Sequence, residues 1–287
     1  MGYYELTQKP NEKELRDYYA NKYYQNEEGA YSKEYTTEEL KYFSNKIEQK
    51  YEIIKAYFSS KKTNTKSLLD IGCGEGFGMN FFWDKGWNVQ GLDFSKYGCE
   101  HMNPEMSKYL TTGNIYENME KLIQSNEKFS VLWMINVLEH VTDPLSLLEK
   151  CKKLIEDDGI MVIEVPNDFS SIQMELLEKS KISEPFWVVV PDHISYFNVN
   201  GLRNLLHKTG WDTHDVITDF PIDFALHNVD TNYIKDNTKG KNVHFSRVGI
   251  ENHLHQISIE KTNALYRAYA DLGLGRQING FFTKAKT

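Results

Sequence analysis

The chain has 287 residues, 40% of them hydrophobic and 26% charged, which is enough to bury one substantial core together with an added subdomain. Its formal net charge is −8, and the 33 Lys and Arg residues are scattered among 41 Asp and Glu. This balance argues against nucleic acid as a partner, because a protein that binds nucleic acid presents a basic face to the phosphates.

The cysteines, the N-terminal residues and the lengths of the apolar stretches indicate the cellular compartment. The three cysteines, Cys73, Cys99 and Cys151, form no CxxC pair, which argues against a disulfide framework and a structural zinc site. The N-terminal residues lack the apolar run of a signal peptide, and no stretch approaches the roughly 18 apolar residues that span a bilayer. We therefore expect a cytoplasmic protein without a membrane partner, and we leave a homodimer open.

Residues 1–60 are predicted to form an N-terminal helical cap. In its second half, apolar residues recur at steps of three and four, as on one face of an amphipathic helix: Leu40, Phe43, Ile47, Tyr51, Ile54 and Phe58. We interpret this face as a packing surface. The alternative is that the segment also closes over a ligand.

Residues 61–220 are predicted to form the core. The apolar runs SLLDIG, WNVQGLDFS, FSVLWMINVLEH and IMVIEVPN have the character of buried strands, and helical stretches separate them. One such helix, PLSLLEKCKKLIEDDG, is expected to end at Gly159. This alternation predicts βαβ units and an α/β fold with a doubly wound, mostly parallel sheet.

Two segments interrupt or follow this alternation. Residues 168–195 or thereabouts are predicted to form a lid-like insert, after which HISYFNVNGLRNLLHKTGW returns to a helix ending at Gly210. Residues 221–287 are predicted to form a substrate-side insert followed by a closing helix and strand. Residues 220–260 show no clean periodicity and contain four histidines.

A glycine-rich loop follows the first strand of the core. Gly72, Gly74 and Gly76 in DIGCGEG allow a tight turn and a close approach of the backbone to a ligand. Asp93 ends the next strand, about 20 residues later, where nucleotide-binding α/β folds place a carboxylate against ribose hydroxyls. The alternatives are a purely structural turn for the loop and a helix-capping role for the aspartate.

Together these motifs resemble those of class I S-adenosylmethionine (SAM)-dependent methyltransferases, which have a Rossmann-like fold. LLDIGCGEGFG, GLDFS, FSVLWMINVLEHVTDP and GIMVIEVPN occur in the family's order over residues 65–170. The likeness is greatest to the branch whose fourth strand ends in "LEH". The C-terminal segment is more weakly similar to relatives in surface-polysaccharide and small-molecule pathways.

The resemblance implies SAM as cofactor and S-adenosylhomocysteine (SAH) as product. The loop would hold the methionine part, Asp93 the ribose, Phe94 the adenine face, and Asn136 the methionine end. Asn114, with Ile115 beside it, replaces the acid that the family often has near the adenine amine, and its amide oxygen could accept the same hydrogen bond. The cofactor residues implied are Asp70, Gly72, Cys73, Gly74, Gly76, Asp93, Phe94, Asn114, Ile115 and Asn136.

An alcohol acceptor benefits from a base that removes its proton as the methyl group arrives, and histidine suits this task near neutral pH. We prefer His193, which follows the insert, and take His140 at the end of the fourth strand as the second candidate. A structural histidine is the alternative for both. Residues expected to line the acceptor cleft are Asp192, Tyr196, Tyr24 and Tyr31.

We expect no metal, because the histidines between residues 220 and 260 have no compact set of acids beside them. The function predicted is O-methylation of a sugar, a nucleotide-linked sugar or a related phosphorylated metabolite in bacterial capsule or lipopolysaccharide synthesis. N-methylation of an amino sugar or another small molecule is the nearest alternative. An NAD-dependent dehydrogenase and a non-catalytic SAM-binding protein are the others.

Overall fold

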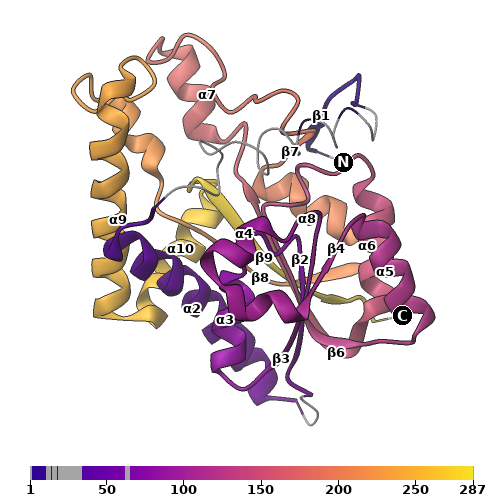
Figure 1. The fold of residues 1–287 in the computed structure, drawn as a ribbon. Helices are drawn as coiled ribbons and strands as arrows, with labels where there is room; N and C mark the ends of the chain where they lie inside the picture. Colours follow the sequence, from indigo (N-terminus) through magenta and orange to yellow (C-terminus); the bar gives the residue numbers. More distant parts are fainter. Residues whose placement is uncertain (1, 11–13, 15–17, 19–33, 62–64, 287) are drawn as a thin grey trace.

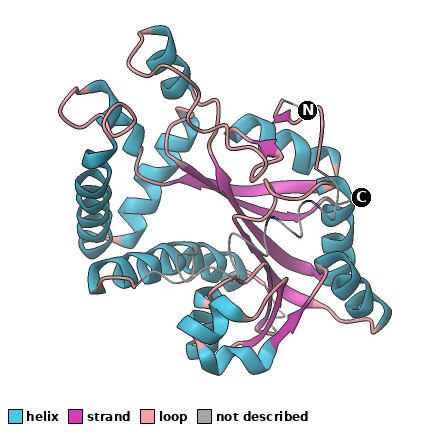
Figure 2. Cartoon of the chain, turned by 45° about the horizontal axis from the view of Figure 1, so that its top comes forward, coloured by secondary structure: helices cyan, strands magenta, loops and turns pink. Residues whose placement is uncertain are grey.

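The computed structural model describes residues 2–10, 14, 18, 34–61 and 65–286. Its centre is a seven-stranded sheet with helices on both faces (Figures 1 and 2). In spatial order the strands are β4 (Leu110–Thr112), β3 (Asn88–Asp93), β2 (Ser67–Ile71), β5 (Phe129–Ile135), β6 (Ile155–Pro166), β9 (Gln277–Lys284) and β8 (Trp211–Thr218).

Strands β4, β3, β2, β5 and β6 are parallel, whereas β9 runs antiparallel to both β6 and β8. The order steps outward from β2 in one direction to β3 and β4 and in the other to β5, so the chain reverses its direction of winding between β2 and β5. In such sheets ligands bind at the carboxyl ends of the strands beside this reversal. The predicted doubly wound α/β fold is therefore confirmed.

Alternation along the strands divides the core between the two faces, because successive strand side chains point in opposite directions. Leu132 and Met134 of β5 pack against one set of helices, α5 (Ile115–Gln124), α6 (Pro144–Leu154) and α8 (Val199–Lys208). Val131 and Trp133 belong to the core on the opposite face. The helices that contribute to it are α2 (Thr37–Ser59), α3 (Phe77–Asp84), α4 (Tyr97–Met102) and α10 (Ile259–Asp271).

The remaining elements lie around the sheet. Strand β1 (Tyr4–Glu5) pairs antiparallel with β7 (Ser195–Tyr196), and α7 (Ser171–Glu178) lies within the predicted insert. Helix α9 (Gly240–Ile257) runs beside α2. Short 3-10 helices complete the described chain: η1 (Pro104–Tyr109), η2 (Ile222–His227) and η3 (Asn237–Lys239).

Helix α2 begins directly after Thr36, which forms a reciprocal capping box with Glu39 at its N-terminus. Ile54 and Phe58 are buried against the sheet, as expected from the apolar stripe. Leu40, at the other end of that stripe, is exposed. The first turns of the helix therefore pack less closely than the last ones.

Several elements differ from the prediction. Helix α6 ends at Leu154 instead of Gly159, since residues 155–159 already belong to β6. Strand β8 and helix α9 were not predicted. In addition, β9 lies between β6 and β8, so the sheet is completed by residues from outside the expected core of 61–220.

Helix α9 has no clean periodicity because much of its contact with α2 is polar. Asn45 donates a hydrogen bond to Asn252 (2.8 Å), and His244 and His255 lie 3.0 and 3.1 Å from glutamates of α2. A helix that packs through such pairs lacks the apolar stripe on which sequence recognition depends. His244 and His255 therefore have structural partners on α2.

Candidate functional site

A cavity of about 940 Å³ follows the carboxyl ends of the parallel strands. It extends across the sheet from Asp93 at the end of β3, past Asn136 after β5, to Glu164 of β6 and Asp219 after β8. Helix α2 covers part of it with Phe43 and other side chains. The volume lies in the upper part of the range for small-molecule sites, large enough for two ligands side by side.

The glycine loop turns between β2 and α3 in a conformation that requires glycine. Gly72, Gly74 and Gly76 have φ angles of +75°, +52° and +77°. A Cβ atom at Gly72 would lie 2.4 Å from Cγ2 of Val137. The loop therefore packs its bare backbone against the segment after β5, and both segments line the cavity.

Asp93 fixes this loop. Its Oδ2 accepts a hydrogen bond from the Gly74 amide (2.8 Å), and its Oδ1 accepts one from the Ser95 amide (3.0 Å). A carboxylate offers about four acceptor positions, and the contact of Asp93 with ribose hydroxyls remains a prediction from the sequence. Phe94 follows at the cavity wall and is 40% exposed, where the sequence predicts contact with the adenine face.

Asp70 lies beneath the loop, and the start of α3 packs directly against it. A Cβ at Gly78 would come within 2.8 Å of its Oδ2. Burial raises the pKa of the Asp70 carboxyl well above its usual value, and the negative charge of Asp93 adds to the effect. Burial likewise raises the pKa of the neighbouring Cys73 thiol, which argues against a nucleophilic thiolate at this position.

The Asn114 side chain also has a structural role. Oδ1 accepts hydrogen bonds from the amides of Tyr116 (2.9 Å) and Glu117 (3.2 Å), and thereby caps α5. The hydrogen bond expected from an adenine amine would add to these two and remains a prediction. Asn114 and Ile115 still line the cavity. Asn136 lines it too, with a φ of +54° and its amide bonded to the Glu164 carbonyl (2.9 Å).

The two candidate bases lie side by side, His140 in the segment after β5 and His193 just before β7. His140 lines the cavity, and the His193 ring stands edge-on to it with the centroids 4.9 Å apart. Nδ1 of His140 lies 2.6 Å from the carbonyl oxygen of Asp192. A carbonyl only accepts, so we infer that Nδ1 carries the proton and Nε2 presents its lone pair. Tyr196 donates a hydrogen bond to the His193 carbonyl (3.0 Å) and is buried.

Glu139 is a site residue that sequence reasoning gave no chemical role. Its carboxyl is 1% exposed, and Oε1 lies 3.7 Å from Nε2 of His140. Burial raises its pKa well above the usual value. The signal available in the sequence was the position of Glu139, an acidic residue directly before a candidate base at the end of a predicted strand. Tyr24 and Tyr31, predicted to contact the acceptor, lie outside the described residues.

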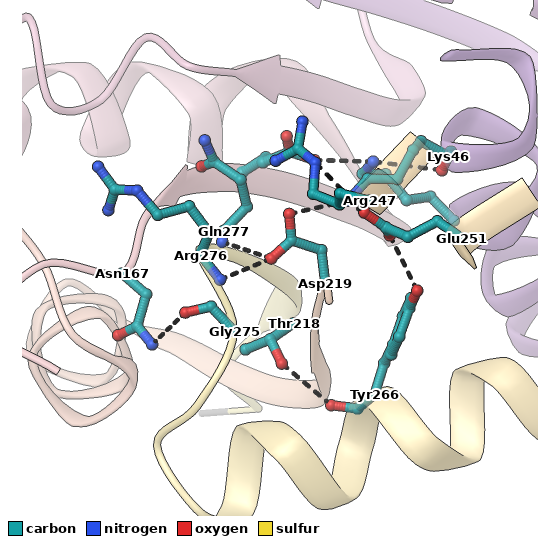
Figure 3. A network of polar contacts seen from close by, with 12 residues as sticks. Lys46, Asn167, Thr218, Asp219, Arg247, Glu251, Tyr266, Gly275, Arg276 and Gln277 are labelled. Atoms are coloured by element: carbon teal, nitrogen blue, oxygen red, sulfur yellow. Dashed lines mark hydrogen bonds and ion pairs between the residues drawn. The ribbon is translucent and has the colours of Figure 1, made fainter. Parts of the chain in front are cut away.

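At its far end the cavity is bounded by charged residues from α2, β6, α9 and the segment after β8 (Figure 3). Lys46 lies 3.3 Å from Asp219 and 3.9 Å from Glu251, and Arg247 lies 3.8 Å from Glu251. Lys50 forms a buried ion pair with Glu164 at 2.7 Å. These residues were also not predicted, because they are far apart in the sequence.

The sheet order, the glycine loop and Asp93 define a class I SAM-dependent methyltransferase. Residues 43–216, more than half of the chain, match the family described as "Methyltransferase domain". The chain belongs to this family. The comparison agrees with the implied cofactor and leaves no support for a dehydrogenase.

Curated relatives include the ubiquinone biosynthesis O-methyltransferases of Actinobacillus pleuropneumoniae serotype 7 and Aliivibrio fischeri. The first is 32% identical over 108 residues, covering 36% of this chain and 46% of the relative. The second is 26% identical over 187 residues, covering 60% of this chain and 77% of the relative. The first match thus spans about half the length of the relative.

Solved structures show the same fold over nearly the whole chain. Burkholderia thailandensis 1,6-didemethyltoxoflavin-N1-methyltransferase, solved with SAH, is 12% identical, with a TM-score of 0.53 over 99% of this chain and 95% of that one. A plantazolicin methyltransferase in complex with SAH is 15% identical, with a TM-score of 0.52 over 96% and 92%. In the described part of this chain, no helix is long and apolar enough to cross a membrane.

Proposed function

We propose that the protein transfers the methyl group of SAM to a hydroxyl oxygen of a small acceptor. The observation that carries this proposal is one continuous cavity with two chemically different ends. The glycine loop and Asp93 line one end, and His140 lines the cavity after β5. A cofactor held by the glycine loop and Asp93 would leave the space beside His140 for the acceptor.

The reaction requires the acceptor to approach the methyl carbon in line with the bond to sulfur. The carbon–sulfur bond breaks with its electron pair remaining on sulfur, and a carbon–oxygen bond forms. The hydroxyl proton passes to Nε2 of His140, because the Asp192 carbonyl holds the ring with this nitrogen as the acceptor. Glu139 beside Nε2 stabilises the imidazolium that results.

Support for an oxygen acceptor comes from the base and from the names of the relatives, which are O-methyltransferases of ubiquinone biosynthesis. We therefore place hydroxylated aromatic compounds first among acceptors. The sugar or capsule acceptor, the homodimer, the cytoplasmic location and the division at residues 60 and 220 remain predictions from sequence. N-methylation remains the second candidate, since one structural neighbour is named an N1-methyltransferase.

Calorimetry with SAH tests the cofactor end. We expect micromolar binding by the wild type and at least tenfold weaker binding by Asp93→Ala, which corresponds to about 1.4 kcal/mol. Asp212 is exposed and lies at the start of β8, so Asp212→Ala is the control and should bind SAH as the wild type does. Absence of SAH binding by the folded wild type would refute the proposal.

Methyl transfer tests the acceptor end. His140→Ala should keep its affinity for SAH and lose about 10²–10⁴-fold in rate on a hydroxyl acceptor, the usual contribution of a general base. His253→Ala, at an exposed position of α9, is the matched histidine control. Equal rates for the two variants would contradict the role assigned to His140.

A further inference from the structure

Glu139, His140 and His193 come together from two segments that are distant in the chain. Glu139 and His140 follow β5, whereas His193 lies just before β7. The Glu139 carbonyl accepts hydrogen bonds from the amides of Ile194 (2.8 Å) and Ser195 (3.0 Å), which join the two segments. The backbone therefore fixes one carboxylate and two imidazoles in one place.

The distances within this cluster suit a metal ion. One ligand atom from each residue lies within 4.8 Å of the others, and Glu139 Oε1 lies 3.7 Å from His140 Nε2. Ligands about 2.1 Å from a tetrahedral ion are roughly 3.4 Å from one another. One pair is thus already near ligand spacing, and the longest separation of up to 4.8 Å would have to shorten by about 1.4 Å on binding.

Glu139 supplies the independent evidence for a cation. Its side chain is 1% exposed, and neither carboxylate oxygen has a hydrogen-bond partner among the described residues. An ionised buried carboxylate without compensation is costly, so such a group either takes up a proton or is held ionised by a cation or a metal. No described Lys or Arg makes an ion pair with Glu139.

The orientation of His140 is also that of a metal ligand. Metal-bound histidines generally donate their other ring N–H to a carbonyl or carboxylate, which fixes the tautomer and the ring. Nδ1 of His140 lies 2.6 Å from the Asp192 carbonyl, so Nε2 is the nitrogen directed toward Glu139. The Asp192 carbonyl, which would orient His140 as a base, would orient it equally well as a metal ligand.

We propose that Glu139, His140 and His193 bind a divalent first-row cation beside the acceptor end of the cavity. Two imidazoles and one carboxylate are a ligand set used by catalytic zinc sites and favour Zn²⁺ over Mg²⁺, which prefers oxygen ligands. The proposal revises our expectation of no metal, which considered only the histidines between residues 220 and 260. None of those histidines belongs to this cluster.

Because His140 lines the cavity, a cation held by these residues would lie beside the acceptor. This consequence rests on the proposed function. A cation held there would lower the pKa of a bound hydroxyl, so that its proton would pass to water instead of to His140. The methyl group would then pass from the SAM sulfur to this oxygen, with the carbon–sulfur electron pair left on the sulfur of SAH. An acceptor with two neighbouring oxygens would fit such a site.

Binding of Zn²⁺ alone to the chelator-treated full chain tests the site. We expect one equivalent with micromolar or tighter affinity by calorimetry. Glu139→Gln, which keeps the shape and removes the charge, and His193→Ala should each weaken binding at least tenfold. His253→Ala should bind as the wild type does. Co²⁺ as a second probe should give absorption bands that Glu139→Gln changes.

SAH calorimetry on the same variants separates this proposal from the proposed function. Normal SAH affinity in Glu139→Gln and His193→Ala shows that they fold and that the cofactor end is intact. If these folded variants bind Zn²⁺ as tightly as the wild type, or the wild type binds none, the metal site is refuted while the methyltransferase assignment stands. If one of the two variants fails to bind SAH, the Zn²⁺ affinity of the other variant tests the metal site.

Discussion

Alanine substitutions at Gly72 and Gly86 measure how closely the glycine loop is packed against its neighbours. The φ angles of the two glycines are almost equal, at +75° and +76°. A Cβ at Gly86 would meet no atom within 4 Å, whereas a Cβ at Gly72 would lie 2.4 Å from Val137 Cγ2. Alanine at each position therefore carries the same backbone cost, and only one substitution adds a clash.

The expected magnitudes follow from this comparison. A left-handed alanine costs roughly 1–2 kcal/mol, which is the whole effect expected for Gly86→Ala. Overpacking adds about 1–3 kcal/mol for Gly72→Ala. Because Val137 receives the clash, the Gly72→Ala/Val137→Ala double variant should show a coupling free energy of at least about 0.5 kcal/mol.

Urea unfolding and SAH calorimetry measure the two consequences. Gly86→Ala should keep its SAH affinity, because its site is remote from the cavity. Gly72→Ala should bind SAH at least tenfold more weakly, since relief of the clash moves the loop that lines the cavity. Equal losses of stability together with unchanged SAH binding would refute the close packing inferred here.

Three further predictions concern single interactions. Thr36→Ala removes the side-chain cap of α2 and should lower the free energy of unfolding by about 1 kcal/mol in urea. Lys50→Met leaves the buried Glu164 carboxylate without its cation and should cost about 3–5 kcal/mol; Lys50→Met/Glu164→Gln should recover most of this loss, and no recovery would contradict the ion-pair explanation. Burial and the Asp93 charge raise the folded-state pKa of Asp70, so stability should fall as pH rises above about 4, the unfolded-state pKa, toward that raised value. Asp70→Asn should flatten this decline in denaturation curves recorded between pH 4 and 7, and an unchanged slope would count against the raised pKa.

The sequence by itself determined the parallel part of the sheet and the cofactor end of the cavity. Buried strands such as SLLDI and FSVLWMI have continuous apolar runs, and the glycines at 72, 74 and 76 are needed by a local turn. These signals lie within a few residues of one another, so they can be read without knowing the fold. The capping box at Thr36 is local in the same way.

Tertiary structure decided the rest, because the contacts involved join segments that no local pattern relates. Helix α9 buries polar groups against α2, so it has no apolar stripe to reveal it. His140 and the Asp192 carbonyl are 52 residues apart in the chain, and only the bonds between the two segments bring His193 to Glu139. The charges of Lys46, Asp219 and Glu251 meet in the same manner, so the charged far end of the cavity exists only in the folded chain.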